Sequence, residues 1–360
     1  MTVALLHNSD SGRGQAARLL SAFEHALKTA AIETKSVRIE RSELALEKAL
    51  QSARALVVIG GDGSVRSALG PAMRAGVPIY HVPVGTENLF ARHFGMSRRP
   101  DSFIGAYRAM RIAMVDVGVC AGKPFALMAS TGPDASVVHR LAAARKGPIT
   151  HASYVPHIFA ELISPRLPLL TITVDGTRVV EGKPGVAVVA NCPGYAMNLN
   201  PAHDACMEDG LLDVVFIPAS SRLALLSWVV RGRLPSWRRD PSVLRRRAHR
   251  VRIDSTDPIA VQIDGDAADE THIDAEIQPG VVRVLLPVAY ASQPRRGLRS
   301  ARRAIGAPAG LAGGSETPGS SGATDVGSGA RPVSGGARLA EEASGDRGRS
   351  SFESAASSIG

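Results

Sequence analysis

Apolar and polar positions in the first third of the chain follow two alternating patterns. Short apolar runs, which predict buried strands, occupy Val3–Asn8, Lys35–Glu40, Ala55–Gly61 and Val77–Pro83. Between them, apolar residues recur at helical spacing over Gln15–Ala30, Arg41–Ala53 and Val65–Met73, and a further helix starts near Glu87. Strands that alternate with helices predict parallel βαβ units. We therefore expect an α/β domain over residues 1–115.

The pattern changes from Arg111–Cys120 onward, where most segments have the length and composition of strands. Leu167–Gly182 is predicted to form a hairpin, because Asp175-Gly176 is a strong turn signal. Helical spacing returns near Ala152–Ile163 and Ser221–Gly232. These patterns predict a β-rich second domain, a β-sandwich, over residues 116–292.

The composition predicts a disordered C-terminal tail, and the net charge indicates a class of binding partner. Residues 293–360 are rich in Gly, Ser, Ala, Pro and Arg without periodicity, so we expect them to be disordered. The net charge of +9 over 360 residues favours anionic partners such as nucleotides and acidic lipids. The three cysteines are too scattered for a metal site or a disulfide framework. With no signal peptide or membrane span in the pattern, we expect a cytoplasmic protein, and peripheral contact with the inner face of the membrane stays open.

Four loops at the ends of predicted strands carry the candidate chemistry: Asn8–Gly14, Gly60–Ser64, Pro83–Asn88 and Ile263–Asp266. Ligands of parallel sheets bind beyond the carboxyl ends of the strands. The glycines of Gly60–Ser64 let a phosphate approach the backbone, and the helix that follows offers N–H groups. A carboxylate at Asp62 would repel a bare phosphate, so it indicates Mg²⁺ or an oriented hydroxyl. A glycine-rich turn capped by Asp62 is the simpler alternative.

Taken together, these loops resemble the diacylglycerol kinase catalytic-domain family, which includes bacterial lipid kinases and sphingosine kinases. The resemblance is carried, in order and spacing, by NSDSG, GGDGS, PVGTENLFAR, VDVG, ANCPGYAMNLNPAHDACMEDGLLDVVFI and VQIDGD. It covers the chain from Val3 to Pro287. It implies an N-terminal domain that binds ATP and a β-sandwich that receives a lipid with a free hydroxyl.

The resemblance also implies roles for individual residues. The implied ATP-binding residues are Asn8, Ser9, Asp10, Ser11, Gly12, Gly60, Gly61, Asp62, Gly63, Ser64, Thr86 and Asn88. The implied catalytic residues are Asp62, Asp264 and Asp266, with Asp266 as the general base on the lipid hydroxyl. Asp62 and Asp264 would hold the catalytic Mg²⁺. A structural Mg²⁺ is implied at Asp209, with backbone oxygens of Cys206 and Leu211.

Three departures from the family pattern keep alternatives open. Asp266 stands where the family usually has Glu, Leu89 where it has Asp, and Arg66-Ser67 where it has Asn-Glu. Arg66 could contact phosphate or face solvent. The resemblance implies an ATP- and Mg²⁺-dependent kinase that phosphorylates diacylglycerol or a related lipid. The departures leave open a catalytically weak or inactive nucleotide- or lipid-binding regulator. An NAD kinase-like enzyme also stays open, because NAD kinases share a GGDG loop.

The basic segment Ser221–Arg252 has two interpretations. It holds ten Arg, one Asp and both tryptophans, Trp228 and Trp237. It could dock on an anionic membrane with the tryptophans at the interface. It could equally be an amphipathic helix on the sandwich, followed by a solvated basic loop. No nucleic-acid motif accompanies the charge, so no nucleic-acid partner is expected. Monomer and homodimer both stay open.

Overall fold

The computed structural model describes residues 2–8, 11–39, 43–144, 151–195, 199–232, 234, 237, 239–269 and 271–290. The predicted disordered tail, residues 293–360, lies outside these ranges. No helix within the described part of the chain combines the length and apolar character needed to cross a membrane.

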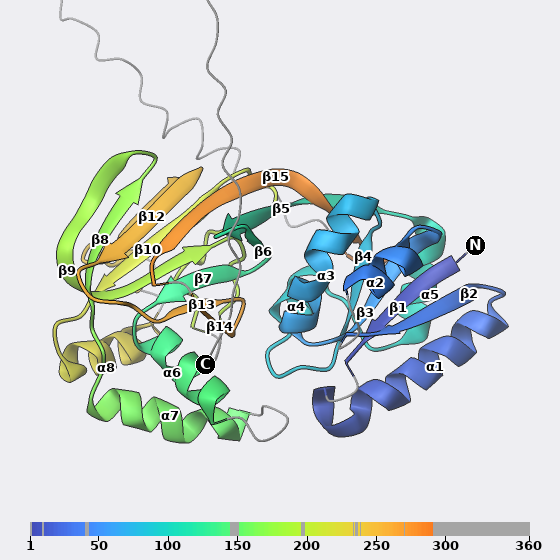
Figure 1. The fold of residues 1–360 in the computed structure, drawn as a ribbon, viewed down its shortest axis with the longest axis horizontal. Helices are drawn as coiled ribbons and strands as arrows, with labels where there is room; N and C mark the ends of the chain where they lie inside the picture. The colour runs from blue at the N-terminus through green and yellow to red at the C-terminus, as the bar shows by residue number, and fades with distance from the viewer. Residues whose placement is uncertain are drawn as a thin grey trace, which may run out of the picture. The chain divides into compact units, whose positions relative to one another are not determined.

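The N-terminal part of the chain is an α/β domain built on a parallel sheet with the strand order β2-β1-β3-β4 (Figure 1). Its strands are β1 (Thr2–His7), β2 (Glu33–Arg38), β3 (Ala53–Gly60) and β4 (Ile79–Pro83). Its helices are η1 (Ser11–Gly14), α1 (Gln15–Thr29), α2 (Glu43–Leu50), α3 (Asp62–Ala75), α4 (Leu89–Phe94) and α5 (Pro100–Ala109). The predicted βαβ alternation is confirmed. The helix α5 was not anticipated.

The burial of the central strands on both faces explains why their sequences are unbroken apolar runs. Val3–Leu6 of β1 and Ala55–Ile59 of β3 are almost completely buried. Strands of a parallel sheet are covered on both faces, so they show no polar alternation. The strands β3 and β4 end at Gly60 and Pro83, and two of the predicted phosphate loops begin there.

The C-terminal part is β-rich and consists of two sheets that share the strand β9, as predicted for a sandwich. Its strands are β5 (Ile112–Cys120), β6 (Lys123–Phe125), β7 (Met128–Thr131), β8 (Leu169–Val174), β9 (Thr177–Ala190), β10 (Leu212–Pro218), β11 (Leu244–Ala248), β12 (Arg250–Ser255), β13 (Val261–Ile263), β14 (Asp266–Ala268) and β15 (Ile273–Leu285). The first half of β9 pairs with β8, and its second half pairs with β7 and β10. Apolar side chains of both sheets, such as Ile172 and Val214, form one buried cluster.

Three helices accompany the sandwich: α6 (Pro133–Ala143), α7 (His151–Ile163) and α8 (Arg222–Arg231). Both predicted helices, α7 and α8, are confirmed. The helix α6 was missed, because its N-terminal PDAS resembles a turn signal more than a helix. Pro133 at the first turn is nevertheless favourable, since that position needs no N–H donor.

Two Asp-Gly dipeptides make the same tight turn in this domain. Asp175 and Gly176 join β8 to β9 with φ values of 46° and 81°, which confirms the predicted hairpin. Asp264 and Gly265 join β13 to β14 with φ values of 50° and 86°. Positive φ at both central residues is the type I′ pattern of two-residue hairpins. The IDGD motif is therefore itself a hairpin turn.

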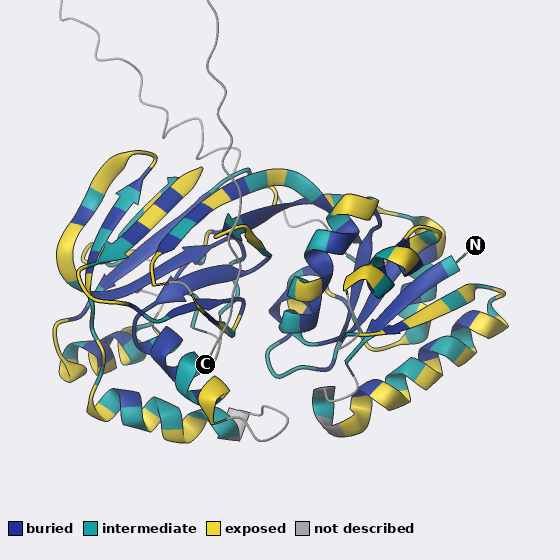
Figure 2. Cartoon of the chain, viewed as in Figure 1, coloured by how far each residue is buried: buried dark blue, intermediate teal, exposed yellow. Residues whose placement is uncertain are grey.

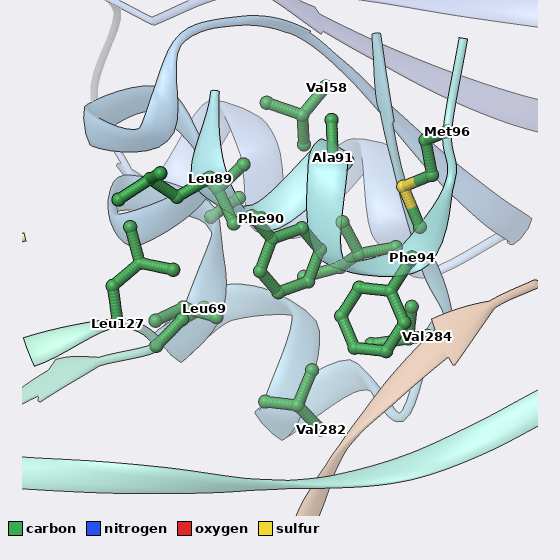
Figure 3. Packing of buried hydrophobic residues seen from close by; sticks show 14 of the residues in the cluster. Val58, Leu69, Leu89, Phe90, Ala91, Phe94, Met96, Leu127, Val282 and Val284 are labelled. Carbon is green, nitrogen blue, oxygen red and sulfur yellow. The ribbon is translucent and has the colours of Figure 1, made fainter. Parts of the chain in front are cut away.

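The strand β15 links the sandwich to the parallel sheet. It pairs antiparallel with β12 and β5, and its residue Val284 is the parallel partner of Ile79 in β4 (Figure 1). The core continues across this link, because Val282 and Val284 cluster with Phe90 and Phe94 of α4 (Figure 3). The phenyl rings of Phe90 and Phe94 lie 5.0 Å apart.

The half-buried ring of His93 generates a pH prediction. Its ring lies edge-on to Phe94 at 4.7 Å, and burial lowers the pKa of His93 to about 4. An unfolded histidine titrates near pH 6.5, so the unfolded chain binds the proton first as the pH falls. The free energy of unfolding should therefore decrease between about pH 6.5 and pH 4. Denaturant unfolding of His93→Gln should show a smaller decrease over that range. Parallel profiles for the two proteins would refute this role of His93.

Candidate functional site

The three predicted nucleotide loops converge at the ends of β1, β3 and β4. The backbone N–H of Val84 donates to the carbonyl of Gly60 at 2.8 Å. A Cβ atom on Gly85 would lie 2.7 Å from the Cα of Gly61, and one on Gly12 would lie 2.5 Å from a methyl carbon of Val84. Side chains at Gly12 or Gly85 would push the loops apart, so these glycines permit the close packing of backbones.

The first turn of α3 faces this convergence with the features of an anion site. The helix starts at Asp62 after the extended residue Gly61. The first N–H groups of a helix have no partner within the helix, and its dipole is positive at this end. A Cβ on Gly60 would lie 2.2 Å from the hydroxyl oxygen of Ser64, so the loop is closed tightly onto the turn. The sequence GGDGS thus forms a strand-to-helix junction that suits a phosphate.

Asp62 connects the first turns of α3 and α4. Its two carboxylate oxygens accept hydrogen bonds from the N–H groups of Leu89 at 3.0 Å and Phe90 at 3.1 Å. These are N–H groups that α4 leaves unpaired, so the carboxylate satisfies them and complements the helix dipole. Leu89, which stands where the family usually has Asp, has a structural role at this position. Its side chain is buried in the core and packs against Gly194.

Two further polar side chains stabilise the loops from within. Asn88 accepts a hydrogen bond from Gly85 N–H at 2.8 Å and donates to the Gly85 carbonyl at 2.6 Å. The buried ring of His81 lies with Nε2 2.9 Å from the Gly60 carbonyl, so Nε2–H is the donor. Burial lowers the pKa of His81, which keeps the ring neutral. Sequence reasoning left His81 out, because a lone histidine in a strand carries no local signal of such a role.

The side chain of Asp264 is hydrogen-bonded to a neighbouring segment of the sandwich. Its carboxylate is buried and accepts hydrogen bonds from the N–H groups of Ala126, Leu127 and Met128 at 2.8 to 2.9 Å. Burial raises the pKa of Asp264 to about 6, and the three hydrogen bonds oppose that rise. The implied catalytic acid is thus occupied with backbone donors.

Asp116, in the VDVG motif, also binds backbone N–H groups of distant segments. Its buried carboxylate accepts hydrogen bonds from Gly210 N–H and Gly280 N–H, both at 2.7 Å. Burial raises the pKa of Asp116. The amide nitrogen of Asn191 donates to the Asp116 carbonyl at 2.8 Å. Sequence reasoning used VDVG only as part of the resemblance, since a single Asp in a strand does not reveal its distant partners.

Asp266 is placed differently from these acids. The hairpin carries its carboxylate to the first turn of α3, where a Cβ on Gly63 would lie 3.3 Å from a carboxylate oxygen of Asp266. Arg66, one turn into α3, donates to the same oxygen at 2.7 Å. The Asp266 side chain is 48% exposed and that of Arg66 is 27% exposed. Arg66 therefore does not simply face solvent, because it holds the candidate base over the nucleotide loop, and its contact with phosphate stays a prediction.

A polar network supports the hairpin from the sandwich side. The side chain of Gln262 accepts from Gly265 N–H at 2.8 Å and donates to Ser130 at 2.6 Å. Asp134 receives hydrogen bonds from Ser130 and, at 2.6 Å, from Tyr195. Burial raises the pKa of Tyr195 well above its usual range, so the phenol stays a donor. Gln262 lies inside the recognised VQIDGD motif, but its period-two position in a strand concealed this supporting role.

The residues implied for a structural Mg²⁺ lie just before β10, and Asp209 has other partners there. A guanidinium nitrogen of Arg247 lies 3.2 Å from one carboxylate oxygen of Asp209, and another lies 3.5 Å from Asp213. The other Asp209 oxygen accepts from Leu211 N–H at 3.2 Å. Within the described ranges, no three His, Cys, Asp or Glu residues are grouped so that they could hold a metal ion. Arg247 supplies positive charge beside Asp209 in this structure, and a Mg²⁺ held by Asp209 with the backbone oxygens of Cys206 and Leu211 stays a prediction of the resemblance.

Most of the sequence-predicted site residues meet at one place. Asn8, Gly12, Gly60, Gly61, Asp62, Gly63, Ser64, Thr86 and Asn88 belong to the converging loops. Asp266 joins them at α3, and Asp264 lies in the same hairpin turn. Ser11 lies in η1, and Ser9 and Asp10 lie outside the described residues. Cys206, Asp209 and Leu211 form a separate group near β10.

Comparison with known families agrees with this architecture. Residues 2–120 match the model of the diacylglycerol kinase catalytic domain. Residues 128–286 match the model of the YegS C-terminal NAD kinase beta sandwich-like domain. The resemblance seen in the sequence is thereby confirmed.

Individual relatives of low sequence identity are named as diacylglycerol or lipid kinases. A protein of Mycobacterium tuberculosis named "Diacylglycerol kinase" is 30% identical over 178 residues, which cover 48% of this chain and 57% of the relative. "Probable lipid kinase YegS-like" of Pseudomonas syringae is 28% identical over 254 residues, covering 65% and 76%. A crystal structure of a Bacillus anthracis diacylglycerol kinase matches with a TM-score of 0.62 at 19% identity, over 81% of this chain and 98% of that chain, which shows the fold alone. The chain spans little more than half the length of the first curated relatives it matches.

The contacts of Asp62 generate a stability prediction. Asp62→Ala leaves two N–H groups at the start of α4 without their acceptor, and should lower the free energy of unfolding by about 1–3 kcal/mol. The matched control is Asp101→Ala, an exposed acid in the first turn of α5, which should cost less than about 1 kcal/mol. Denaturant unfolding of both variants measures the difference. Equal losses would show that Asp62 does not connect the two helices.

Proposed function

We propose that this chain, which carries the diacylglycerol kinase catalytic domain followed by the YegS-type sandwich domain, is an ATP- and Mg²⁺-dependent lipid kinase. Its acceptor is a hydroxyl of diacylglycerol or a related lipid, and phosphatidic acid is the product in the simplest case. One observation carries the proposal: the exposed carboxylate of Asp266 lies over the first turn of α3, where the nucleotide loops converge.

The triphosphate of ATP suits the first turn of α3. Gly61 and Gly63 keep side chains away from the backbone there, and the helix dipole offsets negative charge. Phosphoryl transfer needs positioning and charge neutralisation more than covalent chemistry. The packed glycine loops supply positioning, because the contacts of Gly85 with Gly61 fix one loop against the other.

Mg²⁺ would offset the charge of the phosphates when it is bound with ATP. Asp62 suits a contact with this ion or its waters, because each of its oxygens has only one backbone donor and the residue is not fully buried. Asp264 suits it less well, because its buried carboxylate already accepts three hydrogen bonds. We therefore assign Asp264 to positioning the hairpin and Asp62 to the metal side of the site.

Asp266 is the candidate general base. As the lipid oxygen bonds to the γ-phosphorus, the proton of its hydroxyl passes to the Asp266 carboxylate, the bond to the β-phosphate oxygen breaks, and ADP leaves. Asp is one methylene shorter than the Glu of the family. The type I′ turn at Asp264-Gly265 brings the short side chain of Asp266 to α3, where its carboxylate contacts Arg66.

The ion pair with Arg66 favours a second candidate, a nucleotide- or lipid-binding regulator. A carboxylate engaged by a guanidinium has one oxygen fewer for a hydroxyl proton. The two candidates differ in one result. A kinase moves label from the γ-position of ATP into a lipid, and a regulator binds ATP without doing so.

The decisive assay is transfer of radiolabelled γ-phosphate with Mg²⁺ and separate diacylglycerol, monoacylglycerol and sphingoid acceptors. The wild type should label at least one lipid. Asp266→Asn should lower kcat by about 10²–10⁴-fold, the usual contribution of a positioned base. The Kd for ATP should change less than about threefold, because the carboxylate is replaced by an amide of equal size.

The matched control for this assay is Asp269→Asn, an exposed acid just beyond the same hairpin. It should keep wild-type transfer. Transfer that survives in Asp266→Asn would remove Asp266 from the chemistry. ATP binding with no labelled lipid in the wild type would favour the regulator.

A further inference from the structure

The ion pair between Arg66 and Asp266 uses only part of the guanidinium group. Arg66 lies one turn into α3, a helix with both buried and exposed residues, and is itself intermediate in burial (Figure 2). Its Nη2 donates to one carboxylate oxygen of Asp266 at 2.7 Å. Its Nε is buried and has no hydrogen-bond partner within the described part of the chain. The pair therefore leaves a buried donor unsatisfied.

Two other arginine–aspartate pairs of this protein use both donors. Arg250 donates from Nε and Nη2 to the two oxygens of Asp274, at 3.0 and 2.8 Å. Arg252 donates from the same two nitrogens to the two oxygens of Asp254, at 2.8 and 2.9 Å. In each pair, one edge of the planar guanidinium meets two oxygens, a geometry that suits carboxylate and phosphate alike. The pair at α3 supplies only one oxygen to this edge.

The incomplete pair lies beside the converging nucleotide loops. The Asp266 oxygen that binds Arg66 also lies 3.3 Å from the place of a Cβ on Gly63, in the first turn of α3. Side chains of a helix point back toward its N-terminus, which carries the guanidinium toward that turn. A phosphate bound there that accepts from both Nε and Nη2 would satisfy the buried donor, whose unpaired state costs free energy.

Charge also favours replacing the carboxylate with a phosphate. A terminal phosphate carries more negative charge than a carboxylate and has three acceptor oxygens. The side chains of Arg66 and Asp266 are 27% and 48% exposed. Ion pairs this accessible to water contribute little to stability, so the pair is easily broken. The guanidinium can therefore change partner at small cost.

We propose that Arg66 exchanges partners when ATP binds: it leaves Asp266 for the γ-phosphate, and the released carboxylate becomes open to the lipid hydroxyl. This inference rests on the proposed function, because the γ-phosphate lies next to Asp266 only if Asp266 is the base. ADP lacks the γ-phosphate, so the pair persists in the free protein and with ADP bound. The exchange makes an ion pair that blocks the base compatible with turnover.

The first test is calorimetry without lipid, with Mg²⁺ and either ADP or a non-hydrolysable ATP analogue. Arg66→Gln should weaken binding of the analogue about tenfold or more, because a charge-assisted contact with the γ-phosphate is lost. The Kd for ADP should change less than about threefold, because ADP does not make this contact. Arg66→Lys should recover part of the loss, since lysine keeps the charge but not the planar edge.

The matched control is Arg74→Gln, which changes an exposed arginine near the end of the same helix, paired with Glu43 and Glu47. It should leave both affinities unchanged. Equal weakening of ADP and the analogue by Arg66→Gln would overturn the exchange, and so would unchanged binding of both. A wild type that binds neither nucleotide would overturn the proposed function as well, so the two failures are distinguishable.

A second measurement follows the exchange in the wild-type protein. A ¹⁵N–¹H spectrum of the arginine side chains records the Nε–H of Arg66, which is assigned by its absence from the spectrum of Arg66→Lys. The signal should shift when the ATP analogue is added and stay close to its position with ADP, because only the γ-phosphate becomes an acceptor for this N–H. The same shift with both nucleotides, or none with the analogue, would contradict the exchange.

Discussion

The candidate site depends on carboxylates that accept hydrogen bonds from backbone N–H groups far away in the sequence. Asp62 holds the start of α4, Asp116 holds two glycine N–H groups, and Asp264 holds three successive N–H groups of the sandwich. A buried N–H group without a partner costs as much as a lost hydrogen bond, so each carboxylate fixes two segments together. Asp62 thereby fixes the start of α4 against α3, and Asp264 fixes the hairpin turn that precedes Asp266.

This constraint separates the acids of the recognised motifs by role. Asp116 and Asp264 are enclosed and saturated with backbone donors, whereas Asp266, two residues beyond Asp264, is half-exposed beside Gly63. The Asp264 oxygens are enclosed and already accept three N–H groups, so a lipid hydroxyl cannot reach them, whereas the half-exposed Asp266 carboxylate is accessible at the nucleotide loop. In this arrangement Asp264 positions the hairpin turn, and the turn presents Asp266.

The sequence predicted the parallel strands, the β-rich second part and the convergence of the glycine loops, because periodicity and glycine placement are local signals. It could not reveal the partners of Asp62 or His81, since these contacts join positions that are far apart in the chain. In the sequence, Leu89 takes the place of a carboxylate that the family usually has. In the structure, its N–H donates to Asp62 and its side chain is buried in the core. The sequence left open whether Trp228 and Trp237 lie at a membrane interface or pack on the sandwich, and both are buried. The helix α5 was missed because it follows α4 closely and starts at a proline.

The most direct measurement is a crystal structure of the protein with Mg²⁺ and a non-hydrolysable ATP analogue. If the first turn of α3 binds the triphosphate and Asp266 is the base, the γ-phosphate lies above Gly61 and Gly63. An acceptor oxygen can then fit between the γ-phosphorus and the Asp266 carboxylate, at the roughly 3–3.5 Å separation of reacting atoms. A triphosphate bound away from α3, or a γ-phosphate turned away from Asp266, would contradict this assignment.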